Sequence, residues 1–307
     1  YINKERKKFD TLKTYVELNA YIDEHWAEGA HNFILIDEVQ EIEGWEKSVR
    51  SYRLEDSTDI VITGSNSKML SSELSTLIGG RYQEIYVQSL SYIEFLCFHN
   101  LEDNDEALWK YINYGGLPGL IQTGLDDEDL VWDYIKGVYH TVVLKDIVER
   151  HSIRNVAFLN VLLRYFSDTV GKLTSLNNIC RYMKSQGQDV AVKSVSAYLS
   201  YFRDAYLLAS VGRYDVHGKR LLESNEKLYF GDVGIRNLIA GGEREGDIEK
   251  VLENIVYQQL LRMGYTVNVG QLKAGEVDFV CTRTNERVYV QVAYLVASPQ
   301  TEEREFG

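Results

Sequence analysis

The octapeptide FILIDEVQ, residues 33–40, decides how the rest of the chain is interpreted. Four apolar residues followed by two adjacent carboxylates, Asp37 and Glu38, predict a buried parallel strand with acids at its C-terminal end. In open α/β sheets, ligands bind at that end of the strands. An Asp there can hold the Mg²⁺ of a nucleotide, and a neighbouring Glu can orient and deprotonate an attacking water. The alternative is a buried strand that ends in a solvated acidic turn.

A second predicted strand, residues 59–63, also ends in polar residues, so its tip should face the same crevice. Ser65 and Asn66 follow it, and we expect them to sense the γ-phosphate and to position water. They could instead cap a helix N-terminus, a role compatible with the first. Arg81 could reach the same phosphate in cis or in trans, or form a surface salt bridge. A third strand is predicted at residues 83–87.

Composition limits the classes of protein that the chain can represent. The 307 residues are 45% hydrophobic, enough for two or three domains with real cores. No apolar run approaches the ~20 residues of a membrane helix, and no secretory signal is recognisable, so we expect a cytoplasmic protein with no membrane partner. The three cysteines are widely spaced and predict no disulfide framework or metal cluster. The net charge of −13 argues against coating nucleic acid with the whole surface.

The middle of the chain is the one basic part, with 10 basic and 6 acidic side chains in residues 158–230. Residues 91–155, opened by a capping box of Ser91 and Glu94, predict an all-helical lid. Residues 156–232 predict three helices and a two-stranded hairpin, the winged helix-turn-helix pattern. The candidate contacts to double-stranded DNA are Lys193, Arg203, Lys219 and Arg220. A winged helix used as a rigid spacer or protein-contact module is the alternative.

The last segment, residues 233–307, predicts a helix containing Glu253, a strand bearing Asp278 and a strand bearing Gln291. This layout resembles the PD-(D/E)XK nucleases, in which acids bind Mg²⁺ and a Lys activates water. Gln291 stands at the position of the second acid, and Ala293 at that of the Lys, although Lys273 lies nearby in sequence. A neutral amide is a poor ligand for a hard cation. We therefore expect a binding or assembly module without cleavage activity.

The motifs in their order along the chain resemble a known family of bacterial and archaeal proteins. Residues 33–38, 63–66, 79–81, 90–95 and 115–118 are similar to the predicted ATPases of the AAA+ superfamily, related to the STAND and origin-recognition P-loop ATPases. Residues 146–150, 227–232, 253–257, 276–279 and 291–294 are similar to the C-terminal domain of unknown function that these proteins carry. The resemblance implies an α/β P-loop core, residues 1–90, followed by the three segments described above.

That family has a P-loop, Gly-x-x-x-x-Gly-Lys-Ser/Thr, before its Walker B strand, and this sequence contains no such string. We therefore expect that the sequence is part of a longer chain. The resulting prediction is an ATPase-type switch using ATP and Mg²⁺, with Asp37 on the metal, Glu38 as base, and Ser65, Asn66 and Arg81 near the phosphate. A homo-oligomer and a further protein partner are compatible with it. The alternative is a non-catalytic DNA-binding or regulatory protein that acts through the winged helix.

Overall fold

The structure, a computed structural model, describes residues 1–64, 82–218, 220–242, 245–273 and 275–294. The chain forms two compact units, Tyr1–Tyr86 and Val87–Gly307. Within the described ranges, no helix has both the length and the apolar character that crossing a membrane requires.

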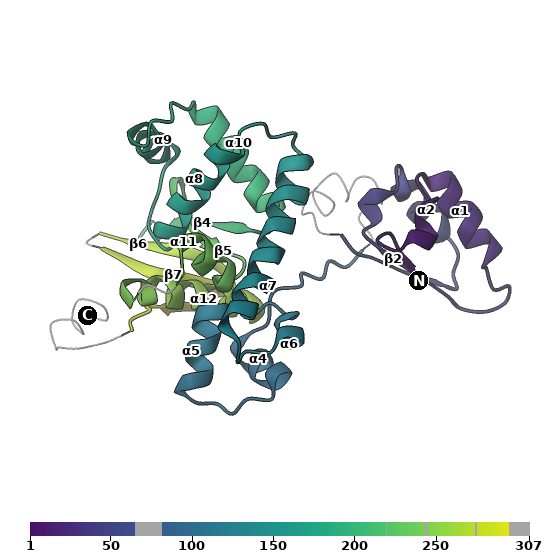
Figure 1. Cartoon of the computed structure of the whole chain (residues 1–307), viewed down its shortest axis with the longest axis horizontal. Helices are drawn as coiled ribbons and strands as arrows, with labels where there is room; N and C mark the ends of the chain where they lie inside the picture. Colours follow the sequence, from purple (N-terminus) through teal and green to yellow (C-terminus); the bar gives the residue numbers. More distant parts are fainter. Residues whose placement is uncertain (65–81, 219, 243–244, 274, 295–307) are drawn as a thin grey trace. The chain divides into compact units, whose positions relative to one another are not determined.

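The first unit is a parallel three-stranded sheet with helices on it, in the order β1-β2-β3 (Figure 1). Its strands are β1 (Ile2–Asn3), β2 (Asn32–Asp37) and β3 (Thr58–Ile62). Its helices are η1 (Lys7–Phe9), α1 (Tyr15–Glu24), η2 (Val39–Glu41) and α2 (Trp45–Tyr52). The parallel sheet predicted from the sequence is therefore confirmed, with the FILID strand at its centre.

Strand β2 buries one face. Ile34 and Ile36 point into the core that α1 and α2 complete, whereas Phe33 is 66% exposed and Leu35 39%. Side chains alternate between the faces of a strand, so the same tetrapeptide supplies both sets. The expectation of a fully buried strand was wrong for Phe33 and Leu35, because an apolar run does not reveal whether both faces are covered.

Local signals for helix ends hold where the structure describes them. Ser91 and Glu94 form the predicted capping box at α4, with the Ser91 N–H donating to the Glu94 carboxylate over 2.8 Å. Ser175 caps α9, the second of the three helices predicted in residues 156–232, by accepting the Asn178 N–H. The strand predicted at residues 83–87 does not form, since residues 82–88 are irregular.

The second unit contains helices on a mixed five-stranded sheet. The helices before the sheet are α4 (Tyr92–His99), α5 (Asp105–Tyr114), α6 (Leu120–Thr123), α7 (Glu128–Thr141), the π-helical η4 (Val142–Glu149), α8 (Val156–Asp168), α9 (Leu176–Ser185) and α10 (Val192–Asp204). The strands are β4 (Leu208–Asp215), β5 (Arg220–Phe230), β6 (Thr266–Leu272), β7 (Gly275–Arg283) and β8 (Glu286–Val290). Between β5 and β6 come α11 (Val233–Ala240), η5 (Glu245–Asp247) and α12 (Ile248–Arg262).

The hairpin of β4 and β5 belongs to the same sheet as the C-terminal strands. The strand order is β5-β4-β6-β7-β8, with β4 parallel to β6 and every other pair antiparallel. The predicted order of three helices followed by two strands is thus present, but the hairpin does not stand apart as a wing. One hydrophobic core runs through residues from all three segments predicted after residue 90.

Helix α12 packs against strands β5, β6 and β7, and two of its side chains are hydrogen-bonded to the end of β5. Asn254 accepts the N–H of Phe230 over 2.7 Å and donates to its carbonyl over 2.9 Å. Gln258, one turn on, donates to the carbonyls of Phe230 and Gly231. These buried side chains satisfy backbone groups that would otherwise be unpaired where the strand ends. They set the rotation of α12 that turns Glu253 toward the sheet.

Candidate functional site

The acid pair of FILIDEVQ lies at the C-terminal tip of the central strand of the first unit. Asp37 accepts hydrogen bonds from neighbours on both sides: Asn3 Nδ2 over 3.0 Å, from the end of β1, and the Thr63 hydroxyl, just after β3. The Tyr1 hydroxyl also donates to it over 3.1 Å. Parallel strands bring their carboxyl ends to one edge, which explains this convergence. The carboxylate is thereby oriented at the edge where α/β proteins bind ligands.

Glu38 has a left-handed backbone, with φ 56° and ψ 50°. This conformation costs an L-residue other than Gly or Asn roughly 1–2 kcal/mol. Gln40 donates a hydrogen bond to the Glu38 carboxylate from the next turn, η2. The chain therefore turns sharply directly after Asp37, and both acids remain at the strand tip.

The donor set at this tip fits a nucleotide-bound Mg²⁺. Magnesium is usually held by one or two carboxylates together with waters and phosphate oxygens. Asp37 supplies such a carboxylate, and the Thr63 hydroxyl is a further hard oxygen beside it. Three other residues predicted for this site, Ser65, Asn66 and Arg81, lie outside the described residues.

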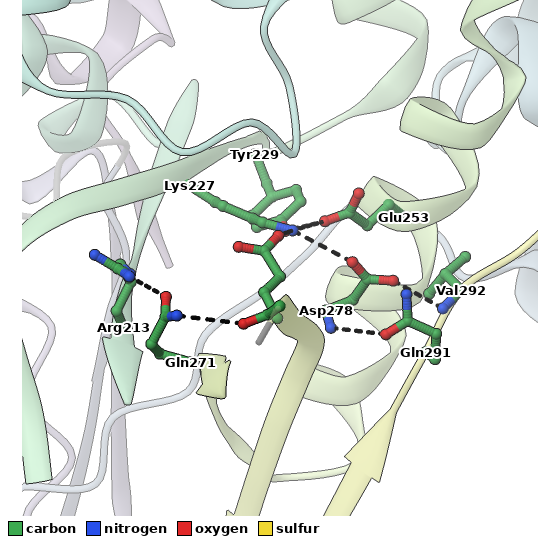
Figure 2. A network of polar contacts seen from close by, with 10 residues as sticks. Arg213, Lys227, Tyr229, Glu253, Gln271, Asp278, Gln291 and Val292 are labelled. Atoms are coloured by element: carbon green, nitrogen blue, oxygen red, sulfur yellow. Dashed lines mark hydrogen bonds and ion pairs between the residues drawn. The ribbon is translucent and has the colours of Figure 1, made fainter. Parts of the chain in front are cut away.

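A second group of polar side chains lies in the C-terminal unit, around the ammonium of Lys227 (Figure 2). Lys227 Nζ is 2.9 Å from Glu253 Oε1, 2.8 Å from Glu276 Oε1 and 3.3 Å from Asp278 Oδ1. The Tyr229 hydroxyl donates to the same Glu253 oxygen over 2.6 Å. Lys227 and Tyr229 are two positions apart on β5, and Glu276 and Asp278 are two apart on β7, so each pair shares a face of its strand. We call Lys227, Glu253, Glu276 and Asp278 the lysine–carboxylate cluster.

Burial and charge act against each other in this cluster. The Lys227 side chain is 2% exposed. Burial alone would lower the pKa of Lys227, but the carboxylates of Glu253 and Glu276 outweigh it and raise that pKa. Burial raises the pKa of Glu253, and the Lys227 ammonium partly offsets this effect. The pKa of the Tyr229 hydroxyl is raised, first by burial and then by Glu253, so the phenol stays a hydrogen-bond donor.

The three residues predicted from the nuclease-like layout meet here. Gln291 Oε1 accepts the backbone N–H of Asp278 over 3.2 Å, and Asp278 Oδ2 accepts the Val292 N–H over 2.9 Å. Figure 2 shows these two bonds between β7 and the segment after β8. Gln291 thus positions Asp278 and directs its amide oxygen away from the centre of the cluster.

Sequence reasoning missed the residue at the centre. Lys273, named as the nearby lysine, is exposed on the turn before β7. Lys227 and Glu276 were included only in the family motifs at residues 227–232 and 276–279. Their meeting with Glu253 needs contacts across 26 and 23 positions of chain. The period-2 spacing of Lys227 and Tyr229, and of Glu276 and Asp278, was the one available signal.

The predicted DNA-contacting cations do not form a free basic surface in the described part of the chain. Arg203 at the end of α10 donates to the Ser210 hydroxyl and lies 3.9 Å from Glu226. Arg220 is 3.8 Å from Asp215 on the facing strand. Lys193 is exposed at the start of α10, and Lys219 lies outside the described residues.

Two family models match parts of this chain, and a relative matches nearly all of it. A family model described as "AAA domain" matches residues 1–96, and a "Domain of unknown function (DUF8612)" matches residues 105–245. An uncharacterized protein of Haemophilus influenzae is 35% identical over 301 residues, 96% of this chain and 74% of the relative. An uncharacterized protein of Methanocaldococcus jannaschii is 32% identical over 278 residues, 85% of this chain and 60% of the relative. A Walker-type ATPase of Pyrococcus abyssi aligns with a TM-score of 0.47 and 16% identity, over 73% of this chain and 66% of that one.

The matching AAA domain and the parallel sheet with its strand-tip acids make the first unit AAA-like, of the P-loop NTPase superfamily. The whole chain belongs to the family of the Haemophilus influenzae protein, with which it aligns through both units.

Proposed function

We propose that the chain is part of an ATP-dependent switch in which the first unit binds and hydrolyses nucleotide. The observation that carries this proposal is the pair Asp37–Glu38 at the tip of the central parallel strand, inside the matched AAA domain. Asp37, oriented by Asn3 and Thr63, would bind the Mg²⁺ of the nucleotide. Mg²⁺, when bound, neutralises charge that develops on the phosphates.

Glu38 acts as the base in this proposal. Its carboxylate directly follows the Asp37 position, so a water between the two acids and the terminal phosphate would be oriented by Glu38 and would transfer its proton there. The left-handed backbone at Glu38 supports this role, because strained non-glycine residues concentrate at functional sites. Ser65, Asn66 and Arg81 remain the proposed phosphate-sensing residues.

The nucleotide state would then be passed to the second unit. Its helices and hairpin share one hydrophobic core, which supports a role as a single responding body. The helices α8 to α10 with the β4–β5 hairpin, and the nuclease-like module, are proposed as binding surfaces within that body.

The test is Mg²⁺-dependent ATP hydrolysis by the full-length protein. Glu38→Gln should lower kcat by about 10²–10⁴-fold and leave nucleotide binding intact, since loss of a general base affects the chemical step. Asp37→Asn should lower the affinity for Mg²⁺, so that half-maximal hydrolysis needs a higher Mg²⁺ concentration. Glu41→Gln, which alters an exposed acid three positions on in η2, is the matched control and should match the wild type. Equal hydrolysis by the wild type and Glu38→Gln would refute the assignment.

A further inference from the structure

The lysine–carboxylate cluster contains a cation that belongs to the chain itself. Three carboxylates from two elements, α12 and β7, lie around one point, and carboxylates are common ligands of catalytic divalent metal ions. At that point lies the ammonium of Lys227 from β5. A residue of the chain therefore occupies the position where a nuclease-like layout would place its metal.

The distances are those of an ammonium. Oxygen ligands lie about 2.0–2.1 Å from Mg²⁺, whereas the three carboxylates lie 2.8–3.3 Å from Lys227 Nζ. A lysine ammonium has three N–H donors, and here each has one carboxylate as acceptor. All three donors of the ammonium therefore have acceptors, and the Lys227 side chain is only 2% exposed.

Two of the carboxylates have a further hydrogen-bond partner besides Lys227. Asp278 Oδ2 accepts the Val292 N–H, and the Gln291 oxygen accepts the Asp278 N–H. Glu253 Oε1 is shared between Lys227 and Tyr229. In agreement, no set of three or more His, Cys, Asp or Glu side chains in the described ranges is arranged to hold a metal ion.

The backbone between α8 and α9 closes one side of the cluster. A Cβ atom on Gly171 would lie 2.5 Å from Glu253 Oε2, so this segment packs directly on the carboxylate. The side chains of Glu253 and Asp278 are 15% and 12% exposed, and that of Glu276 is 31% exposed. A cation that entered the centre would have to displace the lysine first.

We propose that the ammonium of Lys227 replaces a divalent cation in the lysine–carboxylate cluster, so that the native site binds no metal and removal of the lysine side chain creates a metal site. The cluster then serves as a permanent electrostatic link between β5, α12 and β7. It does not serve as a metal-dependent phosphodiesterase centre. This inference is independent of nucleotide hydrolysis by the first unit.

The experiment measures Mn²⁺ binding to the whole chain, without nucleotide, by calorimetry and by the change in Tm. Lys227→Ala should bind one Mn²⁺ per chain more than the wild type, and its Tm, lowered in chelator, should rise with Mn²⁺ until binding saturates. Adding Asp278→Asn to Lys227→Ala should abolish the extra ion. Lys110→Ala, at a lysine paired with Glu106 on the surface, is the matched control and should bind no extra ion.

Two results would overturn the proposal. One is a Lys227→Ala protein that binds no more Mn²⁺ than the wild type does. This holds whether the variant is folded or remains unfolded at saturating Mn²⁺. The other needs no lysine variant: Asp278→Asn in the otherwise unchanged chain removes a bound Mn²⁺ that the wild type holds. That loss would mean that metal and lysine share the site.

Discussion

The carboxylate of Asp232 offers a sharp test of how the second unit is held together. Its side chain is buried, and Oδ1 accepts the N–H groups of Gly234 and Ile235 at the start of α11. Oδ2 accepts the Gly116 N–H over 2.9 Å, from the turn after α5. One residue thus caps a helix and ties it to a segment more than a hundred positions away.

The two oxygens allow the two roles to be separated by substitution. Asp232→Asn keeps the cap, because Asn and Asp are equivalent N-caps, but it turns an amide N–H₂ toward the Gly116 N–H. Loss of a hydrogen bond to a charged group costs about 1.5–3 kcal/mol. Burial raises the pKa of Asp232, so the charge also has a desolvation cost that Asn avoids. We therefore expect Asp232→Asn to lower the free energy of unfolding by about 1.5 kcal/mol, the low end of that range.

Asp232→Ala removes the cap as well, which adds about 0.5–2 kcal/mol. The assay is urea unfolding followed by amide hydrogen exchange in peptides covering residues 115–124 and 233–240, which reports the second unit alone. Asp127→Asn, at the exposed N-cap of α7 with one backbone bond, is the control and should stay within about 0.5 kcal/mol of the wild type. No loss in Asp232→Asn, or equal losses in both variants, would refute the reasoning.

Two further predictions concern the same unit. Burial would raise the pKa of Asp247, but Lys250 and Arg236 hold it below its ordinary value. The contribution of Asp247 to the free energy of unfolding is therefore present above the unfolded pKa of about 3.9, and it is lost as the pH falls through the folded pKa. Acid unfolding should be less steep below that pH in Asp247→Asn, and an unchanged acid limb would contradict the pairing. Gly171→Ala should lower the free energy of unfolding by about 1–3 kcal/mol more than Gly187→Ala. Both glycines have positive φ, but only at Gly171 would the new Cβ meet the carboxylate of Glu253. Urea melts of the two variants that coincide would contradict the packing.

Much of the local structure could be predicted from residues a few positions apart. The capping box at Ser91 and the helix start at Ser175 involve partners three residues away, and such contacts follow from spacing alone. The central strand with Asp37 and Glu38 at its tip was predicted from an apolar run that ends in acids. Glu253, Asp278 and Gln291 were chosen from a family layout, and the structure brings them together.

Other features depended on contacts that no short window contains. The faces of β2 differ because helices cover only one of them, which the apolar run could not indicate. The hairpin of β4 and β5 was interpreted as a wing, but β4 pairs with β6 more than fifty positions later and extends a larger sheet. Strand pairing is decided by which edges meet in the folded chain, and that depends on the whole topology.

The sequence alone determined that the chain contains an α/β unit with two acids at a strand tip, because hydrophobic period and cap residues act locally. Only the tertiary structure decided what occupies the centre of the second unit's acidic site. Lys227 on β5 meets Glu253 on α12 and Asp278 on β7, which are distant from it in the sequence. A buried charge is tolerated only when its counter-charges are arranged around it in space, and that arrangement exists only in the folded chain.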